Sequence, residues 1–233
     1  MYRLSPATLK KDGFATMKFE GMARPEFQEQ HGRVYGAFVP GENAKNQLAR
    51  TIRWGVFAHE RFIWFNRNTY RLSKRFNKEE DGNVRRFGLI PEEYLRLPEI
   101  DQALRQTFAA WGFEQSTFER AYEVQLSAIR YEPTIATTAI PAPIFPHQDM
   151  VDGAVVVTAK TGHLIGGTSR LYTVKDEQPL YEIDLEVGEA LLIRDARLKH
   201  QVTPMLLAMD ARWRPGQRVF RDILIIRYQP LGR

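Results

Sequence analysis

At 233 residues, 43% of them hydrophobic, the chain can bury a sizeable core as one large β domain with additions. It contains no cysteine, which excludes disulfides, thiolate metal ligands and a cysteine nucleophile. Met1 precedes a polar run, and there is no apolar stretch of about 18 residues. We therefore expect a cytoplasmic protein that does not span a membrane.

The net charge of +5 is unevenly distributed along the chain. Residues 1–100 carry 18 basic and 12 acidic side chains, whereas residues 101–233 carry 15 and 16. The excess is densest over residues 50–86, where basic and aromatic side chains are interleaved. Such a mixture can bind nucleic acid by neutralising phosphates and stacking on bases. Aromatic residues this dense more often cover a sheet, with arginine stems along its rim. We favour that interpretation and expect no nucleic-acid partner.

Residues 1–120 have an irregular pattern, punctuated by turn residues at 40–43 and 81–83. Within this region Pro91 begins a predicted helix that extends to about Trp111, because apolar residues recur at helical spacing and Gly112 provides a stop. We expect the N-terminal helices to cover one outer face of the β-structure that follows.

From Tyr122 onward the pattern predicts strands. Polar and apolar residues alternate at first, later segments are β-branched or continuously apolar, and Gly and Pro turns separate them. The predicted strands are residues 122–131, 154–159, 169–174, 180–185, 187–193 and 220–226.

This series of short strands predicts a mainly β protein with flanking helices, built as a double-sheet jelly roll. We expect a single domain over residues 1–233. Its N-terminal part, 1–120, would be a helical or irregular cover, and its core, 121–233, would hold the functional site at the mouth of the roll.

The most informative motif is His147-Gln148-Asp149, which His200 follows 51 residues after the aspartate and Arg221 a further 21 residues on. Alternate residues of an extended segment project to the same side, so His147 and Asp149 can share a ligand. Two imidazoles and one carboxylate suit one face of octahedral Fe(II) and leave three positions open. Arg221 could hold a cosubstrate carboxylate through two parallel hydrogen bonds.

A His-x-Asp pair also occurs by chance in proteins without a metal site. Here the context favours a metal. Prolines 141, 143 and 146 keep the chain extended as it approaches His147, and the other candidate groups lie in or at the ends of predicted strands.

The order and local sequence of these motifs resemble the bacterial Fe(II)/2-oxoglutarate-dependent dioxygenases of the L-isoleucine hydroxylase type, whose relatives include the biofilm, stress and motility protein. The resemblance covers about residues 120–230 and is carried by residues 147–149, 165–169, 195–197, 200–204 and 221–225. The chain departs from the family at Met150, where relatives often have glycine, and over residues 205–220. Its N-terminal half matches no pattern of the family.

The resemblance implies a double-stranded β-helix of the cupin-like jelly-roll type. It implies His147, Asp149 and His200 as iron ligands, with Arg221 as the 2-oxoglutarate anchor. The implied cofactors are Fe(II), 2-oxoglutarate and O2, and the implied reaction hydroxylates a small substrate, preferentially a free L-amino acid, with release of succinate and CO2. Each imidazole is expected to donate its second ring N–H to a nearby acceptor.

Several further residues are weaker candidates. Thr168 and Ser169 could donate to 2-oxoglutarate or to substrate. Gly167 and Arg130 could contact substrate, although paired glycines more often mark a turn and a lone strand arginine is more often solvated. Residues 213 and 214 could form a lid. Asp195 and Asp222 are assigned to turns or to support of the ligands. His31, His59 and His163 have no partners at ligand spacing, and each is assigned to the surface or to a satisfied position.

Two alternatives to a small-molecule hydroxylase stay open. One is a 2-oxoglutarate oxygenase that acts on protein or nucleic acid through the basic segment 50–86. The other is a non-oxygenase, cupin-like metal-binding protein with zinc, manganese or no metal, because a fold does not dictate its chemistry. The sequence predicts neither the substrate's identity nor the oligomeric state.

Overall fold

The computed structural model describes residues 6–36, 48–70, 84–112, 121–149, 151–208 and 216–231. Its helical segments all come from the N-terminal half: α1 (Pro6–Asp12), the 3₁₀ turn η1 (Glu20–Ala23), α2 (Pro25–Gly36), α3 (Glu92–Leu95) and α4 (Pro98–Ala110). Among the residues described, no helix has the length and apolar character that a membrane span requires.

The largest sheet draws strands from both halves of the chain. Its order is β1-β12-β8-β15-β7-β2-β3, with β6 parallel to β2 and the other neighbours antiparallel. The strands are β1 (Phe14–Lys18), β2 (Leu48–Ala58), β3 (Arg61–Phe65), β6 (Gly88–Leu89), β7 (Tyr122–Tyr131), β8 (Gly153–Lys160), β12 (Glu189–Ile193) and β15 (Arg221–Pro230). We call it the major sheet.

Three smaller sheets complete the β-structure. Their orders are β11-β10-β13, β14-β9 and β4-β5. The strands are β4 (Thr69–Tyr70), β5 (Arg85–Arg86), β9 (Leu164–Gly166), β10 (Ser169–Thr173), β11 (Tyr181–Ile183), β13 (Leu198–Val202) and β14 (Met205–Leu207).

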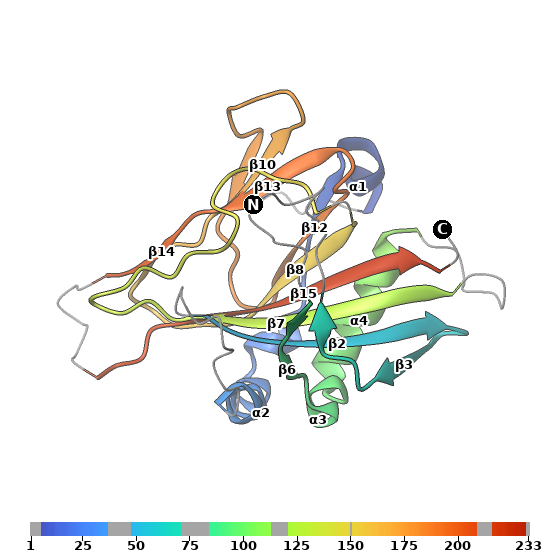
Figure 1. The fold of residues 1–233 in the computed structure, drawn as a ribbon, viewed down its shortest axis with the longest axis horizontal. Coiled ribbons are helices and arrows are strands. Elements are labelled where there is room, and N and C mark those ends of the chain that lie inside the picture. The colour runs from blue at the N-terminus through green and yellow to red at the C-terminus, as the bar shows by residue number, and fades with distance from the viewer. Residues whose placement is uncertain are drawn as a thin grey trace.

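The major sheet separates two hydrophobic cores. One core joins it to the helices, and the other joins it to the sheet β11-β10-β13. Figure 1 shows this layering, with α2, α3 and α4 on one side of the major sheet and β10 and β13 on the other. The double-sheet jelly roll and the helical cover of one outer face, both predicted from the sequence, are confirmed.

The central strands are apolar on both faces because each face packs in a different core. In β8, Val156 packs in the core with the helices and Val157 in the core between the sheets. Leu224 and Ile223 of β15 divide in the same way. Burial from both sides explains the continuous apolar runs of these strands. The prediction for residues 122–131 is also confirmed, since β7 has those bounds.

The single helix predicted from Pro91 to Trp111 is wrong, because the chain forms two helices, α3 and α4. Pro98 is the first residue of α4, and Leu97 before it is extended, with φ −61° and ψ 129°. Proline excludes its predecessor from the α region, which breaks the helix at that point. Gly112, with φ +64°, follows the last turn as predicted.

The N-terminal part is more than a cover, which corrects the expectation of an irregular region. β1, β2, β3 and β6 are strands of the major sheet. Within the basic and aromatic segment, β2 and β3 form a hairpin whose two turn residues, His59 and Glu60, both have positive φ. Phe57, Phe62 and Trp64 of this hairpin pack with the core near α4, where the ring centroids of Phe57 and Phe108 lie 4.2 Å apart.

Candidate metal centre and the pocket around it

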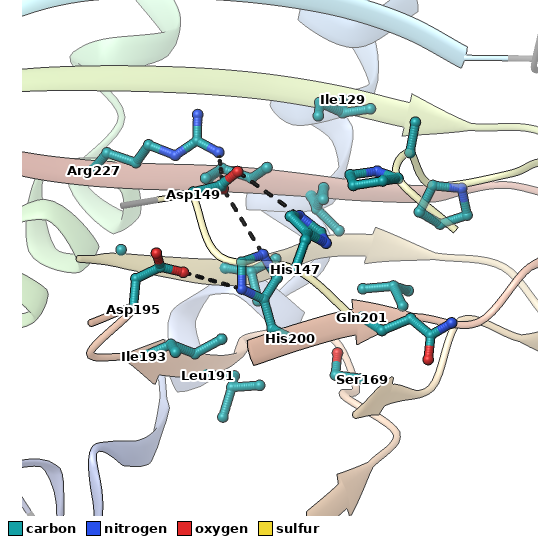
Figure 2. Close-up of a pocket in the computed structure, with 18 of the residues that line it drawn as sticks. Ile129, His147, Asp149, Ser169, Leu191, Ile193, Asp195, His200, Gln201 and Arg227 are labelled. Carbon is teal, nitrogen blue, oxygen red and sulfur yellow. Dashed lines mark hydrogen bonds and ion pairs between the residues drawn. The ribbon is translucent and has the colours of Figure 1, made fainter. Parts of the chain in front are cut away.

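The structure brings His147, Asp149 and His200 together. The backbone of His147 pairs with that of His200 in β13, through N–H···O contacts of 3.1 and 2.9 Å. The Nε2 atoms of the two imidazoles each lie 3.8 Å from an oxygen of Asp149. One ligand atom from each residue lies within 4.8 Å of the other two. Figure 2 shows the three side chains pointing toward one another.

The second nitrogen of each imidazole lies near an oxygen. His147 Nδ1 lies 3.1 Å from the Phe145 carbonyl, and His200 Nδ1 lies 3.3 Å from Asp195 Oδ1. A proton on Nδ1 leaves Nε2 as the free lone pair that faces the centre. Burial lowers the pKa of His147, and His200 lowers it further, which favours the neutral ligand form. These features fit a divalent metal.

Arg227 is a site residue that the sequence analysis missed. It extends from β15, and its Nη2 contacts Asp149 Oδ2 while its Nη1 donates to Gln125 Oε1 at 3.2 Å. Burial alone would raise the pKa of Asp149, but Arg227 and the two imidazoles outweigh it and hold that pKa well below its ordinary value. The period-two alternation that relates Arg227 to Arg221 could have pointed to it.

A pocket of about 300 Å³ opens beside the three side chains. That size suits a small ligand. Aliphatic side chains from the major sheet and β10 form much of its wall, including Ile129, Val155, Leu171, Leu191, Ile193, Ile223 and Ile225. Such a wall excludes water from the space next to the candidate metal centre.

Arg221 begins the row of β15 residues whose later members Ile223, Ile225 and Arg227 line this pocket, although Arg221 itself is not among the lining residues. Its side chain is 3% exposed, and Nη1 donates to the Gly167 carbonyl at 2.6 Å. Its Nε and the Oγ of pocket-lining Ser169 are buried and have no hydrogen-bond partner within the part of the chain that the structure describes. Burial lowers the pKa of Arg221, so an anionic partner would compensate its desolvation. These two orphaned groups fit the distal carboxylate of 2-oxoglutarate.

Residues 167–169 differ in how they lie relative to the pocket. Gly167 is held against Arg221: it has φ +79°, and a Cβ there would lie 2.9 Å from Arg221 Nη1. Thr168 is joined through its backbone to Thr203, with contacts of 3.0 Å in both directions. Neither is among the residues that line the pocket, whereas Ser169 is. The residue of this segment best placed for a ligand is therefore Ser169.

The expectation that Arg130 contacts substrate is corrected. Strand alternation turns it to the opposite face of β7 from pocket-lining Ile129 and Tyr131. There its guanidinium forms two hydrogen bonds with Asp222, of 2.7 and 2.6 Å. His31 Nε2 also lies 3.0 Å from that carboxylate. Arg130, Asp222 and His31 form a buried cluster on this face of the sheet. His31 is a satisfied histidine as expected, whereas Asp222 neither lies in a turn nor supports the candidate ligands.

The other predicted groups divide between structural positions and segments outside the described residues. Asp195 lies beside His200, as expected of a supporting group. His59 and His163 have positive φ and occupy turns. Residues 213 and 214, proposed as a lid, and Met150 lie outside the described residues.

Comparisons with known proteins agree with this geometry. Residues 35–227 match the family model described as 2OG-Fe dioxygenase. The chain is 26% identical over 172 residues to L-isoleucine-4-hydroxylase of Bacillus thuringiensis, which covers 72% of this chain and 68% of that protein. The match to the family model begins at residue 35, within the N-terminal half, where the sequence analysis found no family pattern.

Two solved structures have a similar fold. One is IDO from Bacillus thuringiensis, with a TM-score of 0.76 and 20% identity over 97% of this chain and 93% of that chain. The other is a bsmA homolog from Methylobium petroleophilum PM1, with a TM-score of 0.80 and 19% identity over 98% of this chain and 94% of that chain. The double-stranded β-helix expected from the resemblance is confirmed.

Proposed function

The chain belongs to the 2OG-Fe dioxygenase family, and on that basis we propose that it hydroxylates a free L-amino acid. As a member of the family it is an oxidoreductase that uses Fe(II), 2-oxoglutarate and O2. In the overall reaction 2-oxoglutarate, O2 and a substrate C–H group become succinate, CO2 and a C–OH group.

One observation carries the assignment of the iron site: two imidazoles and a carboxylate present donor atoms within 4.8 Å of one another at the pocket. We assign His147, Asp149 and His200 as the iron ligands. A bound iron ion and 2-oxoglutarate supply the oxidising power of this reaction. Arg227 contacts Oδ2 of Asp149, so the carboxylate that would hold the iron is kept in place by this arginine.

We assign Arg221 and Ser169 to the distal carboxylate of 2-oxoglutarate, because the buried Arg221 Nε and Ser169 Oγ have no hydrogen-bond partner among the described residues. The aliphatic wall then orients the cosubstrate and keeps water away from the reacting C–H bond. A lysine at position 221 would preserve the charge and lose the two-pronged geometry.

The choice of an amino acid rests on two supports. The relative that matches 72% of this chain is an L-isoleucine-4-hydroxylase, and the pocket is of small-molecule size. The test is succinate formation by the Fe(II)-loaded protein with each common L-amino acid, L-isoleucine first. We expect one of them to stimulate turnover and to gain one oxygen atom by mass spectrometry. An unstimulated rate with every amino acid would contradict the proposal.

The alternatives fare differently. The non-oxygenase, cupin-like protein is wrong, because the family is one of dioxygenases. The described part of the basic segment argues against an oxygenase of protein or nucleic acid. Arg53 is buried and bonded to the Ile90 carbonyl and Glu92, while Arg50 and Arg85 line the pocket. The cytoplasmic location and the single domain over residues 1–233 stay predictions.

A further inference from the structure

Each of the two candidate histidine ligands is followed in the chain by a half-buried glutamine, Gln148 or Gln201. The side-chain amide of each glutamine donates to a backbone carbonyl of the opposite segment. Gln148 Nε2 donates to the Asp195 carbonyl at 2.5 Å, and Gln201 Nε2 donates to the Ile144 carbonyl. The arrangement is reciprocal, because each glutamine bonds the segment that leads to the other histidine.

The two acceptors lie next to the oxygens that face the imidazoles. Asp195 carries the carboxylate that lies 3.3 Å from His200 Nδ1, and in Figure 2 it is drawn beside that ring. Ile144 precedes Phe145, whose carbonyl lies 3.1 Å from His147 Nδ1. Each amide therefore holds the backbone close to the oxygen that faces the ring of the other histidine.

Two further hydrogen bonds reinforce this arrangement. The N–H of Asp195 donates to Asp152 Oδ1 at 3.0 Å, so both backbone polar groups of Asp195 are bonded to residues in or just after the His-x-Asp motif. The hydroxyl of Tyr172, which is 4% exposed, donates to Gln201 Oε1 at 2.7 Å. That bond leaves Nε2 as the free donor of the Gln201 amide.

The backbone by itself joins the two ligand segments at one place. His147 and His200 form an isolated bridge, and among the described residues no strand ladder continues it along residues 144–149. A segment attached at one residue pair can turn about that pair. In an antiparallel pairing Ile144 and Asp195 lie toward opposite ends. Hydrogen bonds to both carbonyls therefore oppose such a turn from the two sides of the bridge.

We propose that Gln148 and Gln201 are positioning residues that together fix the two imidazoles relative to each other before a metal binds. This inference rests on the proposed function, since it takes His147, Asp149 and His200 as the iron ligands. Without the amides, the ligands must be ordered at the moment of binding, and that ordering weakens the affinity for the metal. Contacts that support metal ligands typically affect affinity by about 10- to 100-fold.

The test uses Q148M and Q201M, which keep the approximate size and the neutrality of each side chain and remove its N–H donor. Anaerobic titration of the full-length apoprotein with Mn²⁺ measures the dissociation constant. We expect each variant to bind Mn²⁺ about 10-fold more weakly than the wild type. The matched control is Q178M, which changes an exposed glutamine between β10 and β11 and should bind as the wild type does.

The double variant and a spectroscopic probe separate joint positioning from a general loss of stability. In Q148M/Q201M the loss of affinity should be smaller than the product of the two single losses, because removal of either amide already lets the segment turn. The EPR spectrum of one equivalent of bound Cu²⁺ reports the geometry of its ligands. We expect broader lines in Q148M and Q201M, from a spread of imidazole orientations.

Wild-type Mn²⁺ affinity in either single variant would overturn the inference. So would losses that simply multiply in the double variant, or a Cu²⁺ spectrum that is unchanged in both single variants. Failure of the proposed ligand set gives a different result, because H200A would then bind Mn²⁺ as tightly as the wild type. Circular dichroism checks that each variant is folded.

Discussion

At the residue scale, the site depends on a small number of contacts that set which atom of each side chain is available. The oxygens near the Nδ1 atoms of His147 and His200 direct both Nε2 atoms toward Asp149. Arg227 holds one oxygen of that aspartate. Supporting contacts of this kind typically affect metal affinity by about 10- to 100-fold when removed.

Replacing His200 by alanine should abolish turnover and leave the protein folded, because its half-buried side chain belongs to the pocket rather than to either core. Succinate formation and circular dichroism check the two parts of this prediction. H163N, in a turn with φ 63°, is the matched histidine control and should retain activity. Wild-type turnover in H200A would contradict the ligand assignment.

Arg221→Ala should raise the KM for 2-oxoglutarate by about 10- to 100-fold, since a charge-assisted hydrogen-bonding group is lost. Arg221→Lys should recover only part of this loss. The control variant is R218Q. Arg218 lies three residues before Arg221, is exposed and is paired with Glu132. An unchanged 2-oxoglutarate KM in R221A would show that the cosubstrate binds elsewhere.

Arg227→Gln should weaken metal binding by about 10- to 100-fold, because Asp149 loses the group that orients it. Titration of the apoprotein with Mn²⁺ under anaerobic conditions measures this without turnover. The prediction requires that the secondary structure of the variant match that of the wild type. A dissociation constant equal to that of the wild type would leave Arg227 with no role at the metal.

At the element scale, β15 serves both faces of the major sheet. Arg221, Ile223, Ile225 and Arg227 belong to the pocket face, while Asp222, Leu224, Ile226 and Tyr228 are turned toward the helices. A shift of one residue in its register would exchange the two sets and bury Arg221 among the helices. The pairing of β15 with both β7 and β8 fixes that register.

Asp222→Asn should destabilise the protein by about 3–5 kcal/mol, because it leaves the buried Arg130 cation without its carboxylate. E132Q is the control. It breaks the two-pronged but exposed ion pair with Arg218 and should cost about 1 kcal/mol or less. Urea denaturation measures both free energies of unfolding. Similar losses in the two variants would mean that the cluster of Arg130, Asp222 and His31 contributes little.

At the scale of the whole molecule, the candidate metal centre connects two layers. His200 belongs to the sheet β11-β10-β13, whereas Asp149 is held by Arg227 of the major sheet. A metal bound by all three ligands therefore joins the two sheets, and the unfolded chain has no such site.

Metal addition should consequently stabilise the fold. At a hundred times its dissociation constant, Mn²⁺ should add about 2.7 kcal/mol to the free energy of unfolding. The Tm should rise by roughly 2–4 °C for each of these kcal/mol in a chain of this size. Thermal denaturation with Mn²⁺ and with excess chelator measures the difference, and H200A should not respond. An equal metal response in H200A would place the ion elsewhere.

Local pattern was enough for much of the fold and the centre of the site. β7 has its predicted bounds because alternation and composition are local properties. Pro98 is a local signal for a helix break, but the sequence analysis gave more weight to the apolar spacing across it and predicted one helix. β1 was missed, because its place beside β12 depends on pairing Phe14 with Ile193, far away in the chain.

The sequence by itself determined the jelly roll. It also pointed to the three candidate iron ligands and to Arg221 as a candidate carboxylate-binding residue. These predictions follow from periodicity and from the spacing of residue types. Only the tertiary structure decided the partners of the charged side chains. It placed Arg130 with Asp222, Arg227 with Asp149 and Arg50 at the pocket. The physical reason is that strand pairing between distant segments sets which charges meet, and a one-residue change of register sends a side chain to the opposite face.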